Sequence, residues 1–189
     1  MDKDDRENQI ISMKIPMERI GVIIGKGGEV KKYIEEAGQC RIIIDSETSD
    51  VFIEQKGDPL KALAASEVVK AVARGFNPDR AYSLFTENYQ LIVMPLREVA
   101  RKGSNRIKDI KGRVIGREGK TRRIIEDLTD TMISVYGDTV SVIGDYVSVK
   151  YSIEALQMLI SGKKQRTVYA YLEARVRDLK MEKLNENLS

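Results

Sequence analysis

The sequence has no histidine and a single cysteine, Cys40, among its 189 residues. The absence of histidine excludes histidine acid–base catalysis, serine–histidine and cysteine–histidine nucleophile pairs, and zinc sites that need histidine. A single cysteine cannot form an intramolecular disulfide. Because Cys40 precedes the apolar run Ile42–Ile44, we expect a buried small hydrophobic residue rather than a reactive thiol. These absences remove several common catalytic and zinc-binding arrangements. Since the glycine turns described below are built to bind and not to activate water, we predict a protein that is not an enzyme and has no catalytic residues, metal or cofactor.

Long apolar runs are also missing, so no segment approaches the length of a membrane span. The first seven residues are too charged for a signal peptide. Hydrophobic residues make up 42% of the chain, which is enough to build a core. We expect a soluble cytoplasmic protein without membrane contact. The charged fraction of 32%, together with few asparagines, glutamines and cysteines, favours a thermophilic source.

Positive charge is concentrated in one region. The net charge is only +3, but residues 96–126 contain eleven basic and four acidic residues, a net charge of +7 that leaves −4 for the rest. A basic region on an otherwise acidic protein is typical of a site for a polyanion. The alternative is a solvated, charged helix surface.

A short motif occurs twice, 91 residues apart. The segments Val22–Glu35 and Arg113–Glu126 each contain an apolar lead-in, a Gly-x-x-Gly turn, two adjacent basic residues and a helical tail that ends in Ile-Glu. One such turn carries little information, but two in matching contexts indicate a duplicated module.

The pattern around each motif predicts the same order of elements. In the first copy we expect a strand, a helix before the turn, a helix ended by Gly38, a hairpin, and a helix with Leu63, Val68, Val69 and Val72 at apolar positions. The corresponding ranges are 10–16, 17–24, 29–37, 40–44 with 51–54, and 59–73.

The second copy repeats this order from a strand at 91–95, through a hairpin of 131–136 and 140–143, to a helix at 153–160. The distance from proline to first glycine is 9 residues in the first copy and 21 in the second, so the second carries a 12-residue insertion. A long C-terminal helix follows, and its apolar stripe (Val168, Leu172, Val176 and Leu179) is expected to pack on the two modules. The alternative is that this stripe binds a partner.

Each glycine turn is suited to hold a phosphate. Glycines allow positive φ and the close approach of another backbone, and the N-terminus of the following helix carries partial positive charge. The apolar lead-ins, Val22 with Ile24 and Val114 with Ile115, are expected to form a floor for unstacked bases. The predicted RNA-binding residues are Gly25, Lys26, Gly27, Gly28, Lys31, Lys32, Arg113, Ile115, Gly116, Arg117, Glu118, Gly119, Lys120, Arg122 and Arg123.

On these residues the chain resembles the KH family, over about 8–76 and 88–165. The resemblance implies an α+β fold of two type I KH domains (β-α-α-β-β-α), each a three-stranded antiparallel sheet with helices on one face, plus a long C-terminal helix. The expected divisions are a first KH domain at 8–76, a linker at 77–87, and a second KH domain at 88–189 that includes the insertion and the C-terminal extension. KH domains hold about four nucleotides of single-stranded RNA or DNA.

The tandem layout, the insertion and the segment Lys163–Tyr169 resemble a narrower family, the archaeal counterparts of the eukaryotic small-subunit assembly factor called partner of Nob. This resemblance implies binding near the 3′ end of small-subunit ribosomal RNA during ribosome biogenesis and rRNA processing. It also implies two protein partners, the Nob endonuclease and the alpha subunit of translation initiation factor two.

The two turns differ in charge. Residues 22–35 carry a net charge of +1 and residues 113–126 a net charge of +3. The expected hairpin loop of the first copy is acidic, whereas that of the second is short with one acid, Asp138. We therefore expect the second copy to hold RNA more strongly, and the first to contribute less or to dock a protein. Glu118 stands where the family often has a basic residue, and it either faces solvent or reads a base amino group.

Three alternatives remain open from the sequence. The glycine turns imitate phosphate-binding loops of nucleotidases, but neither has the required spacing and residues together. The chain could be a protein scaffold with weak RNA binding. It could also be a KH protein of another pathway, such as RNA decay.

Overall fold

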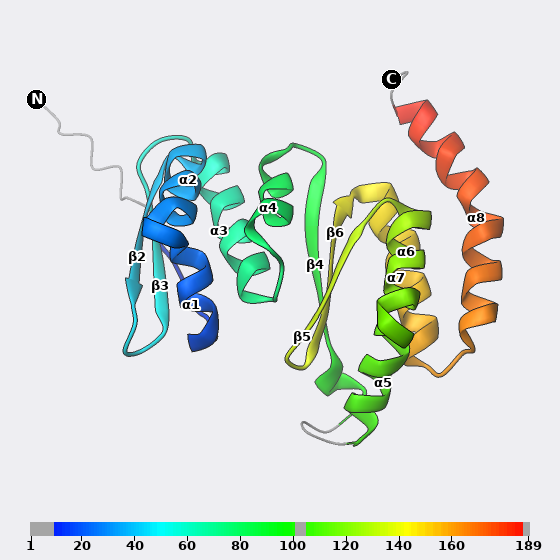
Figure 1. The fold of residues 1–189 in the computed structure, drawn as a ribbon. Helices are drawn as coiled ribbons and strands as arrows, with labels where there is room; N and C mark the ends of the chain where they lie inside the picture. The colour runs from blue at the N-terminus through cyan, green and yellow to red at the C-terminus, as the bar shows by residue number, and fades with distance from the viewer. Residues whose placement is uncertain (1–9, 101–104, 187–189) are drawn as a thin grey trace, which may run out of the picture. The chain divides into compact units, whose positions relative to one another are not determined.

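The computed structural model describes residues 10–100 and 105–186, and the chain divides into two compact units, residues 1–87 and 88–189 (Figure 1). Each unit is built around a three-stranded antiparallel sheet with helices packed on one face, which confirms the expected fold class.

The first unit contains the expected strand, two helices, hairpin and third helix. The sheet order is β1-β3-β2, so the last strand lies in the middle. The elements are β1 (Ile10–Lys14), α1 (Met17–Ile24), the 3₁₀ turn η1 (Lys26–Gly28), α2 (Glu29–Gly38), β2 (Cys40–Asp45), β3 (Asp50–Gln55), α3 (Pro59–Ala73), α4 (Pro78–Ala81) and the 3₁₀ turn η2 (Tyr82–Phe85).

The second unit repeats this topology with the sheet order β4-β6-β5. Its elements are β4 (Tyr89–Pro95), η3 (Leu96–Glu98), α5 (Asn105–Ile115), η4 (Arg117–Gly119), α6 (Lys120–Thr129), β5 (Met132–Tyr136), β6 (Thr139–Asp145), α7 (Tyr146–Ile160) and α8 (Gln165–Glu186). Part of the basic insertion, residues 101–104, lies outside the described residues. Another part lengthens α5, which has 11 residues against 8 in α1.

The cores form where helical stripes meet alternating strand residues. Ile23, Ile34 and Ile53 are fully buried in the first unit. In the second unit, the first part of α8 joins the core, because Val168 and Leu172 are buried among residues of the other helices and strands. Val176 is only half-buried, and the side chain of Leu179 lies outside the described residues.

Gly38 does not end α2 in the expected way. It is the last helical residue, and the left-handed conformation falls on Gln39, with φ 46°. A Cβ at position 38 would lie 2.5 Å from the Cβ of Ala65 on α3. The glycine is therefore explained by close packing of α2 on α3.

Two other expectations about helices are wrong. Leu63 is 53% exposed on α3, whereas Val68, Val69 and Val72 are buried as expected. Helix α7 begins at Tyr146, seven residues before the expected start at residue 153. The missed start signal is Asp145, whose carboxylate accepts a hydrogen bond from the Ser148 N–H at 2.9 Å.

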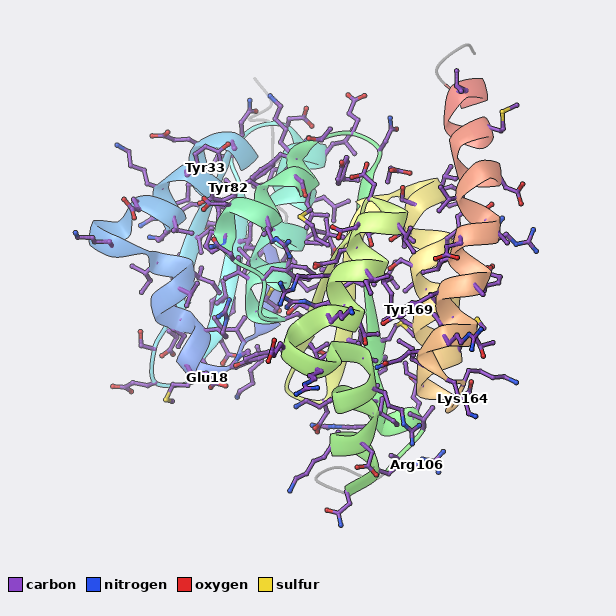
Figure 2. All side chains as sticks on the ribbon, turned by 45° about the vertical axis from the view of Figure 1, so that its right-hand side comes forward. Glu18, Tyr33, Tyr82, Arg106, Lys164 and Tyr169 are labelled. Atoms are coloured by element: carbon purple, nitrogen blue, oxygen red, sulfur yellow. The ribbon has the colours of Figure 1, made fainter. Side chains whose placement is uncertain are left out.

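Residues 77–87, expected as a linker, form α4 and η2 and pack on α3. Ala81 and Leu84 are buried, and the ring of Tyr82 lies 4.2 Å from that of Tyr33 on α2 (Figure 2). Helix α4 corresponds to the start of α8, because each of these helices begins three residues after a glycine of positive φ. These glycines are Gly75 (φ 93°) and Gly162 (φ 96°). Each unit therefore has a fourth helical segment after its β-α-α-β-β-α core.

Candidate nucleic-acid interface

The two glycine turns have nearly the same backbone conformation. In the first GxxG turn (residues 25–28), Gly25 has φ 74° and ψ 174°, and in the second (residues 116–119), Gly116 has φ 72° and ψ 176°. The last glycines, Gly28 and Gly119, are both left-handed, with φ 83° and 77°. The two copies of the motif therefore share the same backbone structure as well as a similar sequence.

The first glycine of each turn is required by both conformation and space. Its φ and ψ lie in a region that is essentially restricted to glycine. A Cβ on Gly25 would lie 2.5 Å from Cγ2 of Val30, and one on Gly116 would overlap Oγ1 of Thr121. The third position differs, because Gly27 (φ 62°) is replaced by Glu118 (φ 54°), a side-chain residue in a left-handed conformation.

Each turn leads directly into a helix whose N-terminus lacks a side-chain cap. Glycine occupies the N-cap position of both α2 and α6, and no side chain accepts a hydrogen bond there. The first N–H groups of a helix have no intrahelical acceptor, and they carry the positive end of the helix dipole. Both turns thus present backbone donors suited to a phosphate oxygen.

The basic side chains that were predicted to bind RNA differ in their ion-pair partners. Lys31 and Lys32 lie 3.7 and 3.8 Å from carboxylate oxygens of Glu35 and Glu36. In the second unit, Arg122 lies 3.7 Å from Glu126. The two lysine pairs are exposed or half-exposed and therefore weak, whereas the carboxylate of Glu126 is buried. All three pairs join residues four apart, so they hold the cations along the helices rather than over the turns.

Arg123 instead donates to the backbone carbonyl of Glu118 within the second turn. The remaining cations at this turn are Arg117 and Lys120, both exposed. Among the described residues, neither has an acidic partner. The residue of the first unit that corresponds to Lys120 is Glu29, so the helix after the turn begins with opposite charges in the two units.

Three of the four apolar residues that were expected to form a floor for bases are accessible at the surface. Val22, Ile24 and Ile115 are half-buried beside the turns. Val114 is fully buried in the core of the second unit and cannot contact a base. The residue of α1 that corresponds to it, Ile23, is also fully buried. The stripe of Ile107, Ile110 and Val114 on α5 is the sequence signal that could have placed Val114 in the core.

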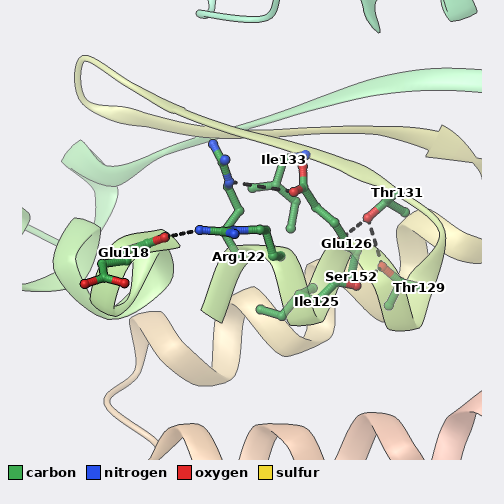
Figure 3. Close-up of polar contacts among 9 residues, drawn as sticks. Glu118, Arg122, Ile125, Glu126, Thr129, Thr131, Ile133 and Ser152 are labelled. Carbon is green, nitrogen blue, oxygen red and sulfur yellow. Dashed lines mark hydrogen bonds and ion pairs between the residues drawn. The ribbon is translucent and has the colours of Figure 1, made fainter. Parts of the chain in front are cut away.

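The Ile-Glu ending that the two repeats share has a structural role that the sequence did not suggest. The Glu35 carboxylate accepts a hydrogen bond from the Ile42 N–H at 2.7 Å, and the Glu126 carboxylate accepts one from the Ile133 N–H at 2.8 Å. Each carboxylate therefore ties the helix after the turn to the edge strand that follows. Figure 3 shows Glu126 in this position, near the hydrogen-bonded hydroxyls of Thr129, Thr131 and Ser152.

The hairpin of the first unit carries an acidic loop. The Asp45 carboxylate accepts hydrogen bonds from the backbone N–H groups of Thr48 and Glu47. These bonds hold the pKa of Asp45 below its ordinary value, so the loop keeps its negative charge at neutral pH.

The hairpin of the second unit is short and fixed by two cations from the basic region. Lys111 donates to the Gly137 carbonyl at 2.9 Å, and Arg97 lies 3.3 Å from the Asp138 carboxylate. These positioning residues were not singled out from sequence, although both belong to the basic cluster. The side chain of Asp138 is thereby paired with a cation, which reduces its repulsion of a phosphate.

A shallow hollow of about 220 Å³ opens at the second turn, lined by Arg117, Glu118, Lys120, Arg123 and Ile124. Four of its five residues were predicted to bind RNA. In the part of the chain that the structure describes, no cluster of metal ligands and no helix able to cross a membrane is found. Cys40 is buried as expected, and burial, with a smaller contribution from Glu35, raises the pKa of its thiol to about 11.

Comparisons with known proteins agree with this geometry. A model described as the KH domain matches residues 10–71, and a model described as the eukaryotic type KH-domain (KH-domain type I) matches residues 90–177. A KH domain-containing protein of Methanocaldococcus jannaschii is 41% identical over 89% of this chain and 74% of its own length. The RNA-binding protein pno1 of Dictyostelium discoideum is 26% identical over 90% and 73%, respectively.

A solved structure adds a three-dimensional match. A chain in the complex of a/eIF2alpha, aDim2p and rRNA from Pyrococcus horikoshii is 38% identical, with a TM-score of 0.87, and 93% of this chain and 98% of that chain are covered. This chain belongs to the tandem-KH family of Pno1 and Dim2 proteins. The resemblance to archaeal counterparts of partner of Nob is thus confirmed. KH domains and the Pno1 relatives are non-enzymatic binding proteins.

The extent of the second KH match bears on α8. It continues to residue 177, well into that helix, whereas the first KH match ends before α4. The contacts agree with this difference, since Tyr169 on α8 donates to Thr121 Oγ1 on α6 at 3.1 Å (Figure 2). The first part of α8 is therefore an integral part of the second KH domain.

Proposed function

We propose that this protein binds single-stranded RNA through its two GxxG turns, without catalysing a reaction, and that the second turn contributes most of the affinity. The observation that carries the proposal is the second turn itself, where an uncapped helix N-terminus meets Arg117 and Lys120 beside an open hollow. Donors, cations and space converge there on one place that a phosphate can reach.

The ranking of the two turns follows from matched positions. Glu29 and the acidic loop around Asp45 repel phosphates at the first turn. At the second turn, Lys120 stands in the position of Glu29. The hairpin there is short, and its single acid, Asp138, is paired with Arg97. The same backbone geometry therefore carries opposite electrostatics.

We propose that the RNA is small-subunit ribosomal RNA near its 3′ end, and that the protein acts in ribosome assembly or rRNA processing in the cytoplasm. The support comes from relatives, one named as an RNA-binding protein and one solved in a complex with rRNA and a/eIF2alpha. The alpha subunit of translation initiation factor two and the Nob endonuclease are the corresponding proposed partners.

The first unit has a feature that favours protein docking. On the face of its sheet away from the helices, Ile10, Ile43 and Phe52 are 56%, 43% and 37% exposed. Exposed apolar side chains beside one another are typical of protein contacts. RNA held by the second unit and a protein held by the first would be compatible roles.

The test is fluorescence anisotropy with an RNA that matches the 3′ end of small-subunit rRNA and a scrambled strand as control. We expect Arg117→Glu/Lys120→Glu to lose most of the affinity, because two cations at the uncapped helix are reversed. Lys26→Glu/Lys32→Glu changes the charge equally at the first turn and should lose less. The proposal would be refuted if binding were weak, equal for the matched and scrambled RNA, and unchanged in both variants. That result would favour the protein scaffold.

A further inference from the structure

A second group of cations lies outside the predicted site, where α7 turns into α8. Lys163 and Lys164 lie in this connection, residues 161–164, and Arg166 lies in the first turn of α8. Arg106 and Arg113 approach it from α5. We call these five residues the elbow cluster. Only Arg113 was among the predicted RNA-binding residues. Figure 2 shows Arg106 and Lys164 at the same end of the second unit.

Contacts bring α5 next to the connection between α7 and α8. The guanidinium of Arg113 lies beside Gly162, and the Gln165 side chain donates to the Arg113 carbonyl at 3.3 Å. Arg106 lines the same hollow as Gln157 and Ser161 at the end of α7. All five cations are exposed, and among the side chains that the structure describes none has an acidic partner.

This placement is electrostatically unfavourable for the protein alone. The N-terminus of a helix favours acids and disfavours cations. Helix α8 has no acid in its first turn and instead carries Arg166 there. Lys164 occupies the position before the helix, where a side-chain acceptor normally caps it, and lysine cannot accept a hydrogen bond. Lys163 alone has a structural reason, since cations are favoured at the C-terminal end of α7.

The first unit supplies an internal comparison. After Gly75, the corresponding connection uses Asn77, whose side chain accepts a hydrogen bond from the Asp79 N–H at 3.0 Å. An acid, Asp79, stands in the first turn of α4. Residues 75–80 have no net charge, whereas residues 162–167 carry +3. The ordinary cap is therefore present in one unit and replaced by cations in the other.

The cluster also lies close to the second GxxG turn. The first part of α8 is bonded to α5 through Gln165 and to α6 through Tyr169. These two helices are the ones that enter and leave the turn. A strand held by the turn can therefore continue along the protein onto the elbow cluster.

We propose that the elbow cluster is a second phosphate-binding surface, which holds the backbone of the same RNA beyond the nucleotides gripped by the second turn. The proposal rests on the function proposed above and extends its site. An RNA backbone supplies the anions that the cations lack, and it also complements the uncapped start of α8. Because no base-reading groove is needed, the contribution is independent of sequence.

The decisive variant is Lys164→Asp/Arg166→Glu. It introduces a good capping residue and an acid into the first turn of α8, so the melting temperature is not expected to fall. The matched control is Lys61→Glu/Lys150→Glu, which makes the same charge change at exposed positions on α3 and α7. The probes are a strand of about four nucleotides, which fills one KH turn, and longer strands that extend it at either end.

We expect the elbow variant to bind the short strand like the parent and the longer strands about tenfold more weakly, with the salt slope reduced by roughly 1.4 for two lost single-strand contacts. The control variant should change neither. Parent-like affinity and salt slope on every longer strand would overturn the proposal and assign the elbow to an acidic protein partner. If the parent protein does not bind the short strand, the proposed role of the second turn is refuted. A lower affinity of the elbow variant for the longer strands would still support the elbow cluster as an RNA contact.

Discussion

The substitution Glu118→Gly separates two explanations for the acid in the second turn. Glu118 has φ 54° and ψ 28°, and the matching residue in the first turn is Gly27. A left-handed conformation costs a side-chain residue about 1 kcal/mol relative to the right-handed one. Glycine avoids this strain but loses more backbone entropy on folding, roughly 0.5–1 kcal/mol. The free energy of unfolding should therefore rise by less than about 1 kcal/mol.

The effect on RNA affinity depends on where the carboxylate points. If it only lies near the phosphate, its repulsion at a separation of about 6 Å in water is about 0.7 kcal/mol. Removing it should then tighten binding about threefold. The gain should shrink at high salt, because the charge is exposed and screened. The hydrogen bond from Arg123 is to the Glu118 backbone carbonyl, so the substitution does not remove its acceptor.

The assay is anisotropy with the parent, Glu118→Gly and Glu118→Gln. The glutamine variant removes the charge but keeps the strained backbone, so it should match the gain in affinity without the gain in stability. The reciprocal Gly27→Glu should weaken any binding at the first turn and lower stability. A drop in affinity for Glu118→Gly and Glu118→Gln would refute this reasoning and show that the carboxylate reads a base.

Three further predictions concern the framework of the site. Gly116→Ala should lower the free energy of unfolding by about 2 kcal/mol or more, measured in urea, because the conformation is restricted to glycine and a Cβ would overlap Thr121. Glu126→Ala should cost about 1–3 kcal/mol because the buried Ile133 N–H loses its acceptor, and a loss below 0.5 kcal/mol would contradict the assigned hydrogen bond. Because the Cys40 pKa is raised to about 11, its contribution to stability is complete below the ordinary pKa near 9 and should fall by roughly 2 kcal/mol as the pH rises from there to about 11. Cys40→Ala should flatten that part of the pH profile.

The helices that were predicted most accurately have both a start signal and a regular stripe. Helix α3 begins at Pro59, and its Val68, Val69 and Val72 are buried, so its expected range is the observed one. Helix α7 was placed seven residues late because Ser148 and Ser152 are also buried, which hides its apolar stripe in the sequence.

Side-chain partners at the site were harder to predict than its location. The spacing of the glycines located both turns, because that backbone conformation requires glycine locally. The partner of Arg123 is a backbone carbonyl, and Lys111 binds a hairpin 26 residues away. Such contacts depend on the three-dimensional arrangement of helices, which residue patterns along one element do not encode. The roles of the predicted RNA-binding residues stay predictions.

The carboxylates of Glu35 and Glu126 have a consequence for association between molecules. Both β2 and β5 are edge strands, and each receives one of these carboxylates on a backbone N–H that its neighbouring strand does not use. An unpaired edge is a template on which another chain can add a strand and begin to aggregate. The carboxylate occupies that donor and places a charge at the edge. Removing it should therefore promote the self-association of folded molecules, so that the Ile-Glu ending of each repeat protects solubility as well as the fold.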